Sequence, residues 1–151
     1  MTMDSSSSAA SSSSPAVPAR SGDAPAWAHF PSLHQRAVFV TGGGSGIGAA
    51  IVQAFAEQGA RVAFVDVARE ASEALVQRLV DAGQARPWWR ACDVRDVSAL
   101  QAAIADAAAE LGDFAALVNN VASDDRHTLE SVTPAYYDER MAINERPAFF
   151  A

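Results

Sequence analysis

A run of glycines between an apolar segment and a longer amphipathic one constrains the fold of this chain more than any other feature. Residues 42–48 read Gly-Gly-Gly-Ser-Gly-Ile-Gly, separated only by Thr41 from the apolar residues 37–40. Glycines at a turn from a strand into a helix let the backbone approach a pyrophosphate, whose charge meets the free N–H groups of the helix N-terminus. The turn predicts a dinucleotide site in an α/β protein. The alternative interpretation is a flexible surface loop.

Short β-branched or aromatic runs alternate with helical patterns from residue 37 onward, which is typical of a parallel α/β sheet. The expected strands are residues 37–40, 61–66, 87–92 and 115–118. The first helix is expected to bury a stripe of apolar side chains, namely Ile47, Ala50, Ile51, Ala54 and Phe55. We therefore predict the N-terminal part of a Rossmann-like, doubly wound parallel sheet with the strand order 3-2-1-4.

The ends of the later helices are also marked in the sequence. Asp96 is expected to cap the helix that begins at residue 97, and Gly112 to end it. A last helix is predicted over residues 133–150, with Pro134 in its first turn. Pro147 would then lie inside that helix and Glu145 near an expected core position.

Asp66 ends the second predicted strand, about 20 residues after Gly46, where dinucleotide folds place an acid that accepts hydrogen bonds from the adenosine ribose. The same carboxylate would repel a 2′-phosphate, so it favours NAD over NADP. Arg69 lies near enough in sequence to complicate this inference. The alternative is an acid that merely ends a strand.

The pattern Thr41-Gly-x-x-x-Gly-x-Gly48 resembles the cofactor turn of the short-chain dehydrogenase/reductase family. Asp93-Val94, Asn119-Asn120 and Asn144 follow in the order that this family shows. The resemblance implies an NAD(P)-dependent oxidoreductase, with an NAD(P)-binding domain over residues 29–151. It implies that Asp93 and the Val94 backbone hold the adenine, and that the two asparagines lie beside the ribose and the central strand. The implied cofactor-binding residues are Gly42, Gly44, Ser45, Gly46, Ile47, Gly48, Asp66, Asp93, Val94, Asn119 and Asn120.

Three further segments resemble the branch of the family that contains D-xylose 1-dehydrogenases and related sugar dehydrogenases. They are residues 30–33, 124–127 and 136–140. This resemblance implies a parent enzyme, expected to be a homo-oligomer, that transfers hydride from a sugar or secondary alcohol to NAD. Residues 121–122 read Val-Ala where the family has Ala-Gly.

Of the family's catalytic residues, only Asn144 is present. The family's serine, and its tyrosine with a lysine four residues later, all follow the asparagine, and the 11 basic residues here are all arginine. We therefore expect a domain that is incomplete at its C-terminus and inactive on its own. The alternative is a stand-alone NAD-binding or regulatory module without catalysis. That alternative would leave the last strand as an unpaired edge, which predicts aggregation.

Two other groups of polar residues are weaker candidates. Tyr136 and Arg140 have the family's tyrosine-to-lysine spacing, but arginine effectively never releases its proton. Asp124, Asp125 and His127 could be imagined as a metal cluster, although a solvated or substrate-side loop is the favoured interpretation. No metal is expected.

Composition and charge exclude several classes of partner. The net charge is −7 and there is no basic run, which argues against nucleic acid and anionic lipid as partners. No apolar run approaches the roughly 20 residues of a membrane helix. Residues 1–28 are rich in Ser, Ala and Pro and are expected to form a disordered leader. With no basic residue before Arg20 and one cysteine, the chain is expected to be cytoplasmic.

Overall fold

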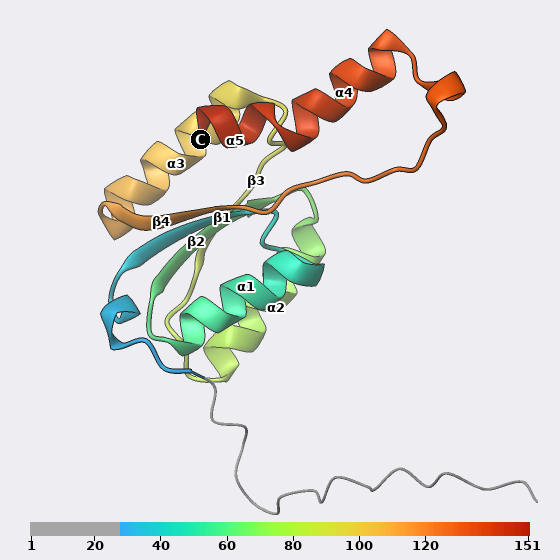
Figure 1. Ribbon diagram of the computed structural model, residues 1–151. Helices are drawn as coiled ribbons and strands as arrows, with labels where there is room; N and C mark the ends of the chain where they lie inside the picture. Colours follow the sequence, from blue (N-terminus) through green and yellow to red (C-terminus); the bar gives the residue numbers. More distant parts are fainter. Residues whose placement is uncertain (1–27) are drawn as a thin grey trace, which may run out of the picture.

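A computed structural model describes residues 28–151 as a four-stranded parallel sheet covered by helices (Figure 1). The strand order is β3-β2-β1-β4, as predicted from the sequence. The strands are β1 (Ala37–Thr41), β2 (Arg61–Asp66), β3 (Trp88–Ala91) and β4 (Phe114–Asn119). The leader expected over residues 1–28 lies, apart from Ala28, outside the described residues.

Helices cover both faces of the sheet, which confirms the doubly wound, Rossmann-like arrangement (Figure 1). The first face carries α1 (Gly46–Glu57) and α2 (Arg69–Asp81), and the opposite face carries α3 (Val97–Leu111) with α5 (Arg146–Phe150). Between β4 and α5 come the short 3₁₀ turn η2 (Leu129–Ser131) and α4 (Pro134–Asn144); a similar turn, η1 (Pro31–Leu33), precedes β1. None of the helices within residues 28–151 is long and apolar enough to cross a membrane.

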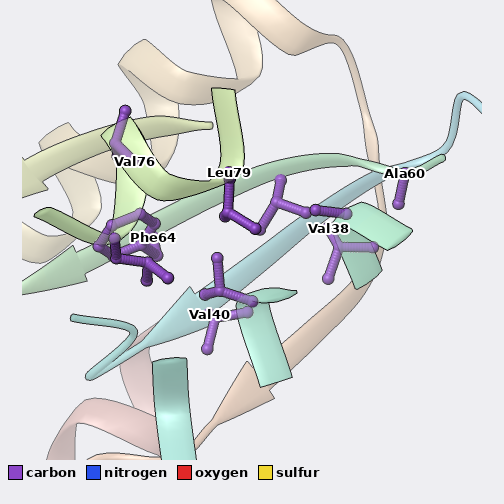
Figure 2. Packing of buried hydrophobic residues seen from close by; sticks show 10 residues of the cluster. Val38, Val40, Ala60, Phe64, Val76 and Leu79 are labelled. Carbon is purple, nitrogen blue, oxygen red and sulfur yellow. The ribbon is translucent and has the colours of Figure 1, made fainter. Parts of the chain in front are cut away.

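The core has two halves because successive side chains of a strand point to opposite faces. Val38, Val40 and Phe64 pack under α1 and α2, where Val76 and Leu79 meet them (Figure 2). Phe39, Ala63 and Val65 pack on the other side, under α3. Burial on both faces explains why β1 and β2 read as nearly continuous apolar runs.

Only part of the stripe expected on the first helix faces the core, where Ile51 and Phe55 are half-buried and pack against it. The buried residues of α1 are Gly48, Val52 and Ala56, whereas Ile47 is 76% exposed and Ala50 and Ala54 are also exposed. The helix is apolar nearly all round, so periodicity does not select one face. The rotation of α1 is fixed instead by Gly48, which must pack against the preceding turn.

The last predicted helix is two helices, which corrects the single element expected over residues 133–150. The break falls at Glu145, whose φ of −118° differs from the helical value. Pro147 therefore lies in the first turn of α5, where proline is well tolerated, and not in a helix interior. Glu145 is exposed, so its charge does not enter the core. Pro134 does begin α4, and Thr133 caps it by accepting a hydrogen bond from Tyr136 N.

Candidate functional site

A cleft of about 630 Å³ opens at the carboxyl ends of the strands, where open α/β sheets bind ligands. The cleft brings together eight of the residues predicted from the sequence: Gly42, Ser45, Ile47, Gly48, Asp66, Asp93, Val94 and Asn120. Gly44, Gly46, Asn119 and Asn144 are not in its lining. The remaining wall comes from Val67, Cys92, Arg95, Asp124, Ile143 and residues 121–122, which the sequence patterns had not assigned to a cofactor.

The glycine-rich turn connects β1 to the N-terminus of α1, and its two ends pack closely against each other at Gly42 and Gly48. A Cβ at Gly48 would overlap the carbonyl oxygen of Gly42 and lie 2.7 Å from Nδ2 of Asn120. Gly46 has a φ of +53°, which side chains disfavour, and nothing would touch a Cβ there. The close packing at Gly48 directs the first turn of α1, with its unpaired N–H groups, toward the cleft.

Asp66 ends β2 at the edge of this turn and is 9% exposed. Its Oδ2 accepts a hydrogen bond from Gly44 N and its Oδ1 one from Ala68 N, each at 2.8 Å. Because each carboxylate oxygen has two lone pairs, both retain one acceptor position. Asp66 thus combines a fixed orientation with two remaining acceptor positions at the cleft.

Arg69 does not neutralise Asp66 directly. Its guanidinium lies 3.8 Å from the Glu73 carboxylate and 5.8 Å from the centre of the Trp89 ring. Arg69 is not in the cleft lining. The complication that its sequence position suggested is therefore removed.

Asp93 follows β3 and carries an ion pair that the sequence patterns did not indicate. Its carboxylate accepts hydrogen bonds from the backbone N and from the guanidinium of Arg95. The Arg95 side chain holds the pKa of Asp93 below its ordinary value, mainly through these hydrogen bonds. Val94 is buried beside it, and burial raises the pKa of the Cys92 thiol. Asp93 is therefore charged and already oriented at the cleft.

Asn120 joins β4 to the glycine-rich turn. Its Nδ2 donates to the carbonyl oxygens of Thr41 and Gly42, both at 3.1 Å, and its backbone N donates to Oγ1 of Thr41 at 3.0 Å. The structure thus gives Asn120 a role in holding the turn. Thr41, the first residue of the turn motif, is the partner that was not predicted.

Asn144 ends α4 and pairs with the loop that follows β4. Its Oδ1 accepts from Ser123 N at 2.7 Å and its Nδ2 donates to Ser123 O at 3.0 Å. It lines a smaller hollow of about 500 Å³ beside the main cleft. Asn144 therefore fixes residues 122–124, two of which line the cleft.

The pair Tyr136 and Arg140 holds the same loop from α4. The Tyr136 hydroxyl donates to Asp125 O at 2.8 Å and lies 2.8 Å from Nδ1 of His127. Arg140 donates to Oγ of Ser123 and to Oδ2 of Asp125. Neither residue of the pair lines the cleft. Within the described residues, no group of three His, Cys, Asp or Glu side chains is arranged to hold a metal ion.

A parallel sheet with the order 3-2-1-4, covered on both faces and carrying a glycine-rich turn at its central strand, defines a Rossmann-like α/β protein. The family model described as "short chain dehydrogenase" matches residues 36–151. The chain belongs to the short-chain dehydrogenase family, and its relatives include several dehydrogenases.

The relatives include two sugar dehydrogenases. The chain is 54% identical over 122 residues to the "Probable galactose dehydrogenase GalD" of Rhizobium meliloti, which covers 80% of this chain and 47% of that protein. It is 46% identical over 121 residues to the D-xylose 1-dehydrogenase of Caulobacter vibrioides, with the same two coverages. The chain thus spans about half the length of the curated relatives it matches.

A solved structure shows the same fold with a cofactor. The short-chain dehydrogenase of Burkholderia cenocepacia in complex with NADP superposes with a TM-score of 0.73 at 31% identity, covering 79% of this chain and 49% of that one. Members of the family bind nicotinamide cofactors, and this neighbour was solved with NADP. They leave the choice between NAD and NADP to the residues of this chain.

Proposed function

We propose that the cleft binds a nicotinamide dinucleotide through its adenosine half and prefers NAD to NADP. The observation that carries the proposal is the Asp66 carboxylate, which is nearly buried at the cleft and has an acceptor position left on each oxygen. Two neighbouring ribose hydroxyls are donors that match these positions. A 2′-phosphate would bring negative charge against Asp66, with Arg69 turned away toward Glu73.

We assign each remaining part of the dinucleotide to a different group of the predicted residues. We assign the pyrophosphate to the turn from Gly42 to Gly48 and the N-terminus of α1, where backbone N–H groups and the helix dipole favour an anion. We assign the adenine to Asp93 and Val94, and the region beyond the pyrophosphate to Asn119 and Asn120. The packing at Gly48 supports this assignment, because the absence of a side chain there lets the first turn of α1 begin directly against the turn at Gly42.

The activity proposed for the whole protein is dehydrogenation of a sugar or secondary alcohol in the cytoplasm by a homo-oligomer. The nicotinamide ring supplies the hydride acceptor when it is bound. Within this chain, Asn144 and Arg140 hold the loop at residues 122–125, which we propose as the substrate side of the cleft. The names of the two relatives support a sugar substrate. For the 151 residues alone we expect binding without turnover, since they contain no lysine.

Calorimetric titration with ADP-ribose and with its 2′-phosphate tests the cofactor preference. The wild-type chain is expected to bind ADP-ribose more tightly. Asp66→Ala and the similarly shaped Asp66→Asn are expected to narrow the difference by roughly 1–3 kcal/mol, because a hydrogen bond to a charged group is lost.

Asp113→Ala is the matched control, since Asp113 is an exposed acid in the turn before β4 and outside the cleft. It should keep the wild-type preference. Equal affinities of the wild-type chain for the two probes would refute the role of Asp66, and absence of binding to either probe would refute the proposed site as a whole.

A further inference from the structure

The cleft contains a cation, Arg95, whose guanidinium forms an ion pair with the Asp93 carboxylate. Its Nε lies 3.0 Å from Oδ1 and 2.9 Å from Oδ2 of Asp93, and its second guanidinium nitrogen lies 2.5 Å from Oδ2. The backbone N of Arg95 also donates to Oδ1 at 3.0 Å. Both residues line the cleft, and their side chains are 51% and 41% exposed.

We propose that Arg95 is a positioning residue that holds the Asp93 carboxylate as the acceptor for the 6-amino group of adenine, and so makes the cleft select adenine over 6-oxopurines. The inference rests on the proposed function, because it assigns the adenine to Asp93. It adds Arg95 as the residue that orients this acceptor and so sets how strongly the cleft selects the base.

The geometry of the pair explains why an arginine is needed. The terminal torsion of an aspartate is broad, so an exposed carboxylate rotates freely unless it is held. The planar guanidinium engages both oxygens at once, and the Arg95 backbone N holds Oδ1 from a second direction. Three N–H groups of Arg95 donate to the carboxylate, with Nε shared between its two oxygens. Because a carboxylate has about four acceptor positions, one position remains for a further donor.

The chemistry of the base then decides which purine fits. The amino group of adenine donates a hydrogen bond to the carboxylate. The 6-oxo group of hypoxanthine is an acceptor, so it forms no hydrogen bond with the carboxylate and is repelled by it. An aspartate is already ionised at neutral pH, and the hydrogen bonds from Arg95 lower the pKa of Asp93 further, which extends its ionised range toward acidic pH. Selection of this kind depends on an ionised and fixed carboxylate, and Arg95 contributes to both properties.

Arg95 could instead act only by attracting the diphosphate, as any cation near an anionic ligand does. ADP-ribose and its hypoxanthine analogue, inosine diphosphate ribose, distinguish the two roles, because they carry the same diphosphate and the same riboses. A purely electrostatic effect would weaken both probes equally. A positioning effect would change the ratio of their dissociation constants.

The experiment measures that ratio by calorimetry for the wild-type chain, Arg95→Ala and Arg95→Gln. We expect the wild type to prefer ADP-ribose by about tenfold, as one hydrogen bond to a charged group would give, and both variants to prefer it by about threefold or less. Arg86→Ala is the control, because Arg86 is an exposed arginine outside the cleft, and it should keep the wild-type ratio.

The outcomes separate this inference from the proposed function. If ADP-ribose binds the wild type but the ratio is unchanged or larger in both arginine variants, the inference is overturned and the proposed function stands. If the wild type binds neither probe, both are overturned. Two independent replacements at the same exposed position guard against a folding defect in one of them, which circular dichroism would reveal.

Discussion

At the level of single residues, some members of the candidate site could be found from the sequence and others could not. The dinucleotide that we propose for the turn requires glycines in a fixed pattern, so Gly42 to Gly48 and the acid Asp66 could be proposed from the sequence. The role of Arg95 could not be found, because it acts by holding another polar group and its spacing carries no motif; Thr41 belongs to the turn motif, but the motif does not show that its hydroxyl accepts from Asn120 N. An acid followed two residues later by an arginine was the signal available for Arg95.

The two glycines of the turn are expected to respond differently to alanine. Gly48→Ala should lower the free energy of unfolding by about 3 kcal/mol or more, because the new Cβ would overlap Gly42 O and crowd Asn120. Gly46→Ala should cost about 1–2 kcal/mol, since only its positive φ is disfavoured and no atom lies within 4 Å of a Cβ there. Urea unfolding followed by circular dichroism measures both, and the steric account fails if Gly48→Ala costs no more than Gly46→Ala.

Among the elements, strands and caps followed from the sequence more closely than helix orientation did. The strand at residues 61–66 has the predicted bounds, since apolar residues buried on both faces leave a continuous run between turn signals. The predicted face of α1 was right at Ile51 and Phe55 but wrong at Ile47, Ala50 and Ala54, because an alanine-rich helix has no dominant stripe and its rotation depends on a contact with the turn. The break at Glu145 was missed because a proline can begin a helix as well as interrupt one.

The cap of α3 supports a prediction at this scale. Asp96 Oδ1 accepts a hydrogen bond from Ala99 N at 3.0 Å, as the sequence predicted. Asp96→Ala is expected to lower the free energy of unfolding by about 1 kcal/mol, whereas Asp96→Ser should retain most of the stability.

Ser98→Ala provides the control for this cap, because Ser98 is exposed in the same first turn. It should change the stability little. Thermal or urea unfolding of the four proteins is the measurement. Equal stability of Asp96→Ala and the wild type would show that the hydrogen bond to Ala99 does not stabilise the helix.

At the scale of the whole molecule, β3 and β4 form the two edges of the sheet, and β1 and β2 lie between them. All five residues of β1 are buried, whereas residues of β4 alternate between half-buried and exposed. Within residues 28–151, β4 pairs with β1 alone. Topology could be predicted because each strand and helix carries its own pattern, but the exposure of β4 depends on what lies beside it, which no local pattern encodes.

The open edge leads to the last prediction, which concerns self-association of the 151-residue chain. An edge strand offers unpaired N–H and C=O groups, and Leu117 adds an apolar side chain that is 42% exposed. The chain is expected to associate increasingly with concentration in sedimentation velocity experiments, and Leu117→Lys should raise the monomer fraction. Leu129→Lys is the control, since Leu129 is 90% exposed but lies in η2, away from the sheet edge. A wild-type chain that stays monomeric at every concentration, or equal effects of the two lysines, would show that β4 does not direct the association.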